Sequence, residues 1–152
     1  FEWTGNSIRL PATVKEIGAY AFSSCDGISS LPLSDGIESI GDGAFSDCMR
    51  IVEIDLPDSI RSVGVGAFSG MRYLRKVYIG DGIEVLSKEM LSGCQNLESI
   101  SFGESIVRIE NDVFLDCTHT YEIVYRGAKK DFERIEILGD DTLIYAQVVF
   151  EK

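Results

Sequence analysis

A repeat of 23 residues runs through most of this 152-residue chain and constrains its fold more than any other feature. The pair Ala21-Phe22 returns as Ala44-Phe45 and Ala67-Phe68, and in looser form at residues 90–91 and 113–114. No insertion breaks the spacing. A unit of this length cannot bury its own apolar face, whereas stacked copies build one continuous core. The repeat therefore predicts a solenoid of stacked coils.

The columns created by this spacing are almost entirely apolar. Eight positions of the unit can be followed through five copies, and of the resulting 40 sites only Thr120 is neither apolar nor Cys. With 45% of the chain apolar, chance alone would leave about half of these sites polar. The columns therefore mark a buried interior along the stack. Three of them read Val14, Ile37, Ile60, Ile83, Ile106; Cys25, Cys48, Met71, Cys94, Cys117; and Leu31, Ile54, Val77, Ile100, Ile123.

Each coil is predicted to contain two strands. Ile54-Asp55-Leu56 and its copies, such as Leu31-Pro32-Leu33, alternate between buried and exposed positions and are expected to form one parallel sheet. After a turn, Ile37 and Ile40 predict a second, shorter strand. The glycines that follow this second strand predict a positive φ or a close backbone approach: Gly18, Gly41 and Gly64.

A short helical turn is expected to complete each coil. In residues 42–48, Ala44, Phe45 and Cys48 fall at i, i+1 and i+4, which suits one helical turn with an inward face. The predicted fold is therefore an α/β solenoid of about five 23-residue coils, with a parallel sheet and short helical turns.

The unit around residues 51–68 carries a recognisable pattern. It consists of residues 51–54, Leu56-Pro57-Asp58-Ser59-Ile60, Val63-Gly64 and Ala67-Phe68. These residues resemble the BspA-like leucine-rich-repeat family of bacterial surface proteins, and the resemblance covers roughly residues 8–125. It implies a right-handed leucine-rich-repeat superhelix located extracellularly or at the cell surface.

The tail resembles the closing segment of such arrays. Ala128 stands where that pattern has Thr, which weakens the expected helix start. Ala128, Phe132 and Ile135 fall at i, i+4 and i+7 and predict a helix, while Val148 and Phe150 predict a last strand. We expect one domain over residues 1–152, with repeats at about 8–125 and a C-terminal cap at about 126–152. The matching tail residues are Tyr125, Gly127, Asp131, Phe132, Ile135 and Ile137.

The N-terminal residues 1–5 are too short to form a coil. Two interpretations are open: the array is truncated there, or Phe1 and Trp3 fold over the first coil as a lid. Because the chain begins at Phe1 and not at Met, we expect it to be a piece of a longer precursor.

Charge and hydropathy narrow the classes of partner. Asp and Glu outnumber Lys and Arg by 25 to 14, giving a net charge of −11. Such a field repels phosphate backbones and anionic headgroups, which makes nucleic acid and membrane surfaces poor partners. No apolar run reaches about 18 residues, so no direct membrane insertion is expected. We expect a monomer.

The four cysteines are predicted to be buried free thiols. The spacing places Cys25 over Cys48 and Cys94 over Cys117, where a disulfide could just span the distance between coils. Met71 occupies the same column, however, which indicates a site for a compact apolar side chain. Zinc would need four convergent ligands, which a single column does not provide.

No catalytic or cofactor-binding constellation is evident. His119, the only histidine, is expected on a surface loop, away from the inward-pointing Cys117. The Asp-Gly pairs are typical of turns, although weak calcium binding by an acidic edge stays open. No glycine-rich phosphate loop is present, so no cofactor is implied. A serine column predicts hydroxyls bonded to neighbouring backbone: Ser23, Ser46, Ser69 and Ser92.

The outward side of the main sheet is the candidate binding surface. Residues between the buried positions of each first strand point there, and repeat proteins commonly bind along such surfaces. An aromatic ring and both signs of charge come together around residues 53–78, as at binding hot spots. A solvated face without a ligand is the alternative. The candidate partner-binding residues are Glu53, Asp55, Arg75, Lys76, Tyr78 and Ser101.

The sequence thus favours a non-enzymatic binding or adhesion module whose ligand is a protein or a glycan. The alternative is a structural spacer that holds another domain away from the cell. An enzyme is least favoured, because no column provides a polar cleft with a perturbed acid, base or nucleophile.

Overall fold

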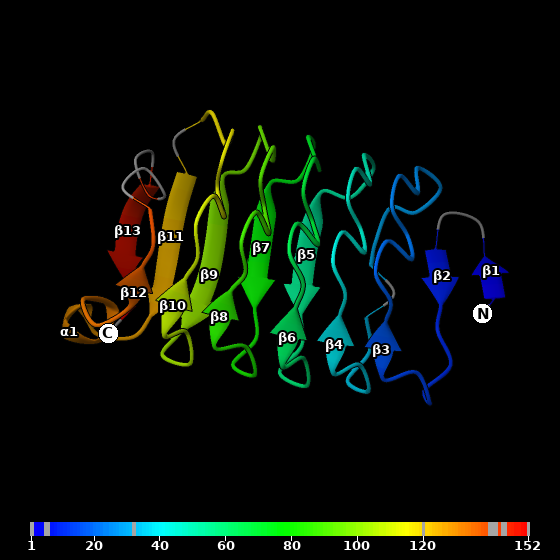
Figure 1. The fold of residues 1–152 in the computed structure, drawn as a ribbon, viewed down its shortest axis with the longest axis horizontal. Coiled ribbons are helices and arrows are strands. Elements are labelled where there is room, and N and C mark those ends of the chain that lie inside the picture. The colour runs from blue at the N-terminus through cyan, green and yellow to red at the C-terminus, as the bar shows by residue number, and fades with distance from the viewer. Residues whose placement is uncertain are drawn as a thin grey trace.

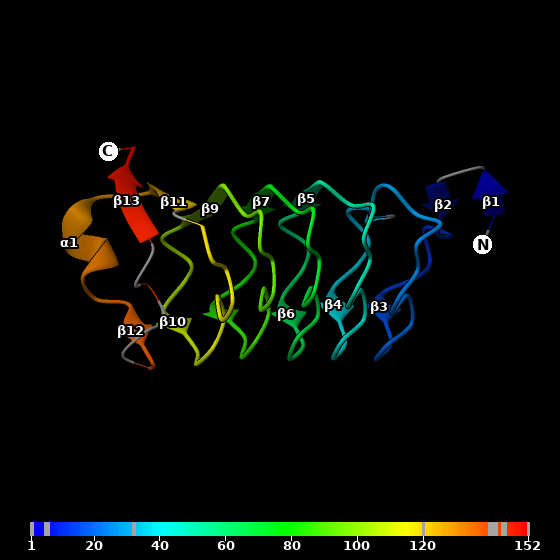
Figure 2. The ribbon, with the colours of Figure 1, turned by 90° about the horizontal axis from the view of Figure 1, so that it is seen from above.

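The computed structural model describes residues 2–4, 7–31, 33–119, 121–139, 143 and 146–151, with side chains from Ile8 onward. The chain winds into coils that stack along one axis, with the N-terminus at one end and a cap at the other (Figures 1 and 2). Within the repeats, paired parallel strands lie 23 residues apart in the sequence, as Glu53 and Lys76 do. The predicted solenoid is confirmed.

A five-stranded parallel sheet, here called the main sheet, forms one side of the stack. Its strands are, in order, β5 (Glu53–Leu56), β7 (Lys76–Ile79), β9 (Ser99–Gly103), β11 (Tyr121–Arg126) and β13 (Ala146–Phe150). Burial alternates along them, so that Ile54 and Leu56 enter the core while Glu53 and Asp55 face solvent. The first strand of each coil is therefore confirmed from residue 53 onward.

The main sheet ends at β5, although one more strand was predicted at residues 31–33. Leu31 and Leu33 lie outside any described strand and are only partly buried. Pro32 and Thr120 lie outside the described residues, and a proline has no N–H to donate to a ladder. Nearer the N-terminus, β2 (Ser7–Arg9) pairs antiparallel with β1 (Glu2–Thr4). Phe1 and the side chain of Trp3 also lie outside the described residues.

Two-residue strands form the opposite side of the stack, as predicted (Figure 2). β3 (Glu16–Ile17), β4 (Ser39–Ile40) and β6 (Ser62–Val63) make one parallel sheet. β8 (Val85–Leu86), β10 (Arg108–Ile109) and β12 (Glu136–Ile137) make another. Among the described strands no pairing joins β6 to β8, and a hollow of about 390 Å³ lies at this break.

A serine hydroxyl that replaces a main-chain donor explains the break, because Glu110, which also carries a Cβ at this position, still donates its N–H to the Leu86 carbonyl at 3.0 Å. A Cβ on Gly41 would lie 2.6 Å from a backbone nitrogen of the preceding coil, so glycine permits a close approach there, and Gly64 is equally confined. The next copy has Ser87, whose Oγ donates to the Val63 carbonyl in place of a main-chain N–H. The predicted close approach is confirmed at Gly41 and Gly64 but not at Gly18, and none of the three has a positive φ.

The segment predicted to be a short helical turn is instead a run of tight turns. The N–H groups of Ala44 and Ser46 donate to carbonyls three residues earlier, at 3.3 and 3.0 Å. Between them, the Phe45 N–H donates to Ala67 O of the next coil at 2.8 Å. The segment therefore adds a third ladder between coils. Two positions per coil have a positive φ, which an α-helix excludes: Tyr20, Gly43, Gly66, Glu89, Asp112, and Ser24, Asp47, Gly70, Gly93, Asp116.

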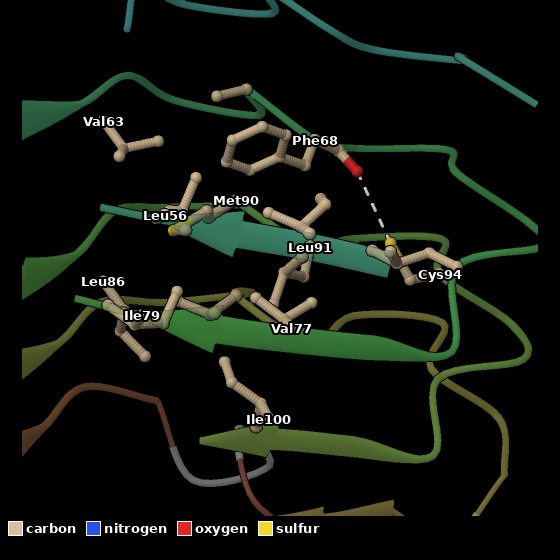
Figure 3. Packing of buried hydrophobic residues seen from close by; sticks show 14 of the residues in the cluster. Leu56, Val63, Phe68, Val77, Ile79, Leu86, Met90, Leu91, Cys94 and Ile100 are labelled. Carbon is tan, nitrogen blue, oxygen red and sulfur yellow. Dashed lines mark hydrogen bonds between the residues drawn. The ribbon is translucent and has the colours of Figure 1, made fainter. Parts of the chain in front are cut away.

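The core columns stack as the spacing predicts. The Phe22 and Phe45 rings lie 5.2 Å apart between centroids, and those of Phe45 and Phe68 lie 5.9 Å apart, with tilts of only 6° and 10°. Leu91 continues this column in the next coil (Figure 3). Phe45 and Phe68 are fully buried, and each such side chain contributes about 1.5–3 kcal/mol, which makes the interior the main source of stability.

The C-terminal cap closes the core with apolar side chains. Its helix, α1 (Lys129–Phe132), is a single turn and shorter than predicted, and Ala128 provides no side-chain cap, as its replacement of Thr suggested. The Phe132 ring lies 5.8 Å from that of Phe150 on β13, which confirms the predicted last strand. Ile135 lies beyond the helix and is still buried.

Candidate binding surface

The solvent side of the main sheet, here called the outer face, presents two rows of side chains in register across the strands. Alternate residues of each strand point to it. One row mixes charged and polar side chains, whereas the other is uncharged beyond its first member. The rows run Glu53, Lys76, Ser99, Glu122, Gln147 and Asp55, Tyr78, Ser101, Val124, Val149.

Five of the six residues predicted from the sequence come together on the outer face. Lys76 Nζ lies 4.0 Å from Glu53 Oε1. Asp55 and Ser101 flank Tyr78 in the register, and Tyr78 is 43% exposed. An exposed ion pair contributes at most about 1 kcal/mol, so these charges are not needed to hold the sheet together.

Arg75, the sixth predicted residue, lies outside these rows. It precedes β7, and its Nη2 and Nε donate to one carboxylate oxygen of Glu98 at 2.5 and 2.8 Å. Glu98 stands 23 residues later, in the next coil. The charge of Arg75 is therefore already paired across the stack.

Arg126, at the end of β11, is the residue of this surface that sequence reasoning missed. Its guanidinium carbon lies 4.3 Å from the centre of the Tyr78 ring, within cation–π range. Nη1 donates to Ser101 Oγ at 3.0 Å, and Nη2 donates to the Ile79 carbonyl at 2.9 Å and to Asp81 Oδ1 at 2.8 Å. Only 18% of the Arg126 side chain remains exposed. Arg126 thus fixes the Tyr78 ring against the sheet.

Gly103, which faces Arg126 in the register, makes room for this contact. A Cβ there would lie 2.7 Å from Asp81 Oδ1 and 3.4 Å from Arg126 Nη2. A glycine inside a strand is itself a sign of close approach, and it could have pointed to Arg126. Nothing in the sequence indicated the contact between Arg126 and Asp81, because these two residues stand 45 positions apart, which does not match the repeat spacing.

The comparisons with known proteins agree with this architecture. The sequence profile of the BspA type leucine-rich repeat region matches residues 1–120 in six copies. The chain belongs to this family. A leucine-rich repeat protein from Bacteroides ovatus is similar at a TM-score of 0.78 and 30% identity, over 92% of this chain and 35% of its own. One from Eubacterium ventriosum reaches 0.70 and 28%, over 80% and 33%.

A leucine-rich cell surface protein from Faecalibacterium prausnitzii shares the fold at a TM-score of 0.51 and 22% identity, over 85% of this chain and 37% of its own. The BspA-type chain thus spans about a third of the length of the Bacteroides and Eubacterium proteins. None of the curated proteins matches the sequence significantly.

The six copies of the BspA-type repeat correct the predicted number of about five, which began near residue 8. Ile8 and Leu10 stand 23 residues before Leu31 and Leu33 and extend two of the apolar columns toward the N-terminus.

The four cysteines of the BspA-type array are free thiols. Cys48 and Cys94 each donate from Sγ to a carbonyl of the preceding coil, at 3.1 and 3.4 Å, and Figure 3 shows the second of these bonds. Burial disfavours the thiolate and raises the pKa of Cys48 to about 11 and that of Cys117 to about 12. Protonated thiols are poor nucleophiles. Three cysteines are buried as predicted, whereas Cys25 is only partly buried.

The other polar residues considered from the sequence have structural partners. His119 is exposed, as predicted, with Nδ1 2.6 Å from Gln95 O. Ser46 Oγ lies 2.8 Å from Ser23 Oγ and donates to Gly43 O at 3.0 Å, which confirms the serine column for this pair. Within the part of the chain that the structure describes, no three His, Cys, Asp or Glu converge as metal ligands. No described helix is long and apolar enough to cross a bilayer.

Proposed function

We propose that this chain is a non-enzymatic binding or adhesion module of a bacterial surface or secreted protein, whose outer face recognises a protein or a glycan. The observation that carries the proposal is the Tyr78 ring, 43% exposed on the outer face and held by Arg126. A ring that is already fixed loses little conformational entropy on binding, and Tyr is enriched at binding hot spots for this reason.

The surroundings of Tyr78 support a ligand that is partly apolar and partly polar. A hollow of about 320 Å³ beside β5 is lined by Leu31 and Leu33 and by the carboxylates of Asp35, Glu53 and Asp55. Apolar contact area with a few placed polar groups is typical of ligand sites. A sugar or peptide resting on Tyr78 would find hydrogen-bond acceptors within this hollow.

The proposed location is extracellular or at the cell surface. The Faecalibacterium protein that shares the fold is described as a leucine-rich cell surface protein. The net charge of −11 disfavours nucleic acid and anionic membranes as partners, which leaves proteins and glycans.

The test compares two double variants of the immobilised chain. Extracellular matrix proteins and a glycan array are screened first for a ligand of the wild-type chain. Tyr78→Ala with Lys76→Glu is then expected to weaken capture of that ligand by about tenfold or more. Tyr73→Ala with Lys88→Glu makes the same chemical changes at exposed residues outside the outer face and is expected to bind normally.

Unchanged capture by the Tyr78→Ala, Lys76→Glu variant would show that the outer face is not the binding surface. A structural spacer would capture nothing from either panel and would tolerate the charge reversal in its full-length parent. Circular dichroism melting of both variants checks that the array stays folded.

A further inference from the structure

A hollow of about 290 Å³ lies where the last coil meets the cap, lined in part by Asp131 of α1 and by Tyr125 on the inward side of β11. It is separate from the outer face, because Tyr125, which lines it, points to the opposite side of the main sheet from Arg126. Both apolar and charged side chains surround it. The lining residues are Glu104, Ile106, Val107, Tyr125, Asp131, Arg134 and Ile135.

The Tyr125 ring is fixed by its neighbours, and the residue lines the hollow. The residue is only 1% exposed, and its ring packs edge-on against those of Phe102, Phe132 and Phe150 at 5.8, 5.2 and 6.2 Å. No described residue forms a hydrogen bond with the Tyr125 hydroxyl, which keeps contact with solvent. The hydroxyl therefore presents both a donor and an acceptor to the hollow.

Two carboxylates and one guanidinium line the hollow, so its lining carries more negative than positive charge. Burial raises the pKa of Tyr125, and the carboxylates of Glu104 and Asp131 raise it further because they disfavour a second negative charge beside them. Both carboxylates thus act on the phenol oxygen. A positively charged group would be stabilised at the same place.

Arg134 of this chain shows that a guanidinium group fits at the edge of the hollow. Its Nη1 donates to Asp131 Oδ1 over a long 3.3 Å, from a residue three positions later. The Arg134 side chain is 76% exposed, whereas that of Asp131 is 26% exposed, so the guanidinium approaches the carboxylate from the solvent side. An exposed pair of this kind is worth at most about 1 kcal/mol and is easily displaced.

We propose that this hollow, here called the cap pocket, accepts the guanidinium of an arginine side chain from a partner protein. Its aliphatic stem would lie on Ile106, Val107 and Ile135. Its N–H groups would donate to the Asp131 carboxylate and to the Tyr125 phenol oxygen, in competition with Arg134. The net charge of −11 also favours a basic partner.

Titration of the whole chain with Nα-acetyl-arginine amide, followed by NMR, tests the cap pocket. Saturable shifts are expected at the amides of Gly127, Asp131 and Arg134 and at the Tyr125 ring. Nα-acetyl-citrulline amide has the same shape without the charge and is expected to cause no saturable shift. Asp131→Asn should weaken binding about tenfold, as expected for a hydrogen bond between charged groups.

Three further variants separate the proposed contacts. Arg134→Ala removes the competing guanidinium and should tighten binding several-fold, whereas Lys129→Ala removes an exposed cation of α1 that does not line the pocket and should change nothing. Tyr125→Phe keeps the ring and its packing but should weaken binding several-fold.

Equal binding of the citrulline compound, unchanged affinity in Arg134→Ala or Tyr125→Phe, or no saturable shift with the arginine compound would each overturn the proposal. Melting temperatures close to that of the wild type exclude unfolding as the cause. The outer face is unaffected by these variants, so the outcome is independent of the proposed function.

Discussion

The cysteine column shows what a single residue type contributes to each coil. Cys117 repeats the pattern of Cys48 and Cys94, with Sγ 3.3 Å from the Leu91 carbonyl oxygen of the preceding coil. The thiol thus fills a small apolar site and also satisfies a main-chain acceptor. The sequence predicted the burial from the apolar column, but not the hydrogen bond, because Met71 fills the same position without a donor.

The raised thiol pKa values predict a loss of stability in alkaline solution. A thiol of the unfolded chain ionises near 9.0, whereas that of folded Cys48 ionises near 11. Above about pH 9 the unfolded state binds fewer protons than the folded state, so the free energy of unfolding falls by up to about 1.4 kcal/mol per pH unit for each such thiol. Below about pH 8 these thiols have no effect. Urea unfolding at about pH 8 and about pH 10 measures the fall.

A variant with Cys48→Ala and Cys117→Ala serves as the comparison for this titration. It will be less stable than the wild type at every pH, but its unfolding free energy should depend less on alkaline pH. If both proteins lose the same free energy between the two pH values, the buried thiols are not responsible.

At the scale of the elements, the strands could be predicted and the turn segment could not. The alternation of apolar and polar residues in Ile54-Asp55-Leu56 fits only a half-buried strand. The inward spacing of Ala44, Phe45 and Cys48, in contrast, fits a helical turn and a run of tight turns equally well. The positive φ at two positions per coil decides between these structures. At Tyr20 and Glu89 the sequence did not indicate this φ, because neither residue is a glycine.

The break between β6 and β8 should close in Ser87→Gly. Without the hydroxyl that now donates to it, the Val63 carbonyl can accept the N–H of position 87, as the Ile40 carbonyl accepts that of Gly64 and the Leu86 carbonyl that of Glu110. The new hydrogen bond contributes about 1 kcal/mol, which the greater flexibility of glycine largely offsets. We therefore expect nearly unchanged stability but slower hydrogen exchange of the amide at position 87.

The reciprocal change gives the matched control for this prediction. Gly64→Ser should open the ladder between β4 and β6 and speed exchange of the amide at position 64, whose N–H donates to Ile40 O at 2.8 Å. Equal exchange rates in Ser87→Gly and the wild type would mean that the serine does not cause the break.

As a whole molecule, the array is nearly one-dimensional, because each coil is hydrogen-bonded mainly to its two neighbours. Arg126 is an exception, since its Nη2 reaches the Ile79 carbonyl 47 residues earlier and so joins coils that are not adjacent. The stacking of each coil on its two neighbours follows from the 23-residue spacing, which is why the fold could be predicted from the sequence. The candidate binding surface could be predicted only in part, because Arg126 crosses coils outside the repeat register.

A one-dimensional array should lose order from the end at which it is damaged. Phe132→Ala removes the cap ring that packs on Tyr125 and Phe150 and should cost about 3 kcal/mol, near the lower limit for a partly buried phenylalanine. Hydrogen exchange measured by mass spectrometry should then show protection lost in β11 and β13 but kept in β3 and β4. Phe45→Ala, in the middle of the stack, should instead lower protection in the coils on both sides of it. If Phe132→Ala lowers protection evenly along the chain, the coils unfold as one cooperative unit, and nearest-neighbour stacking does not describe their stability.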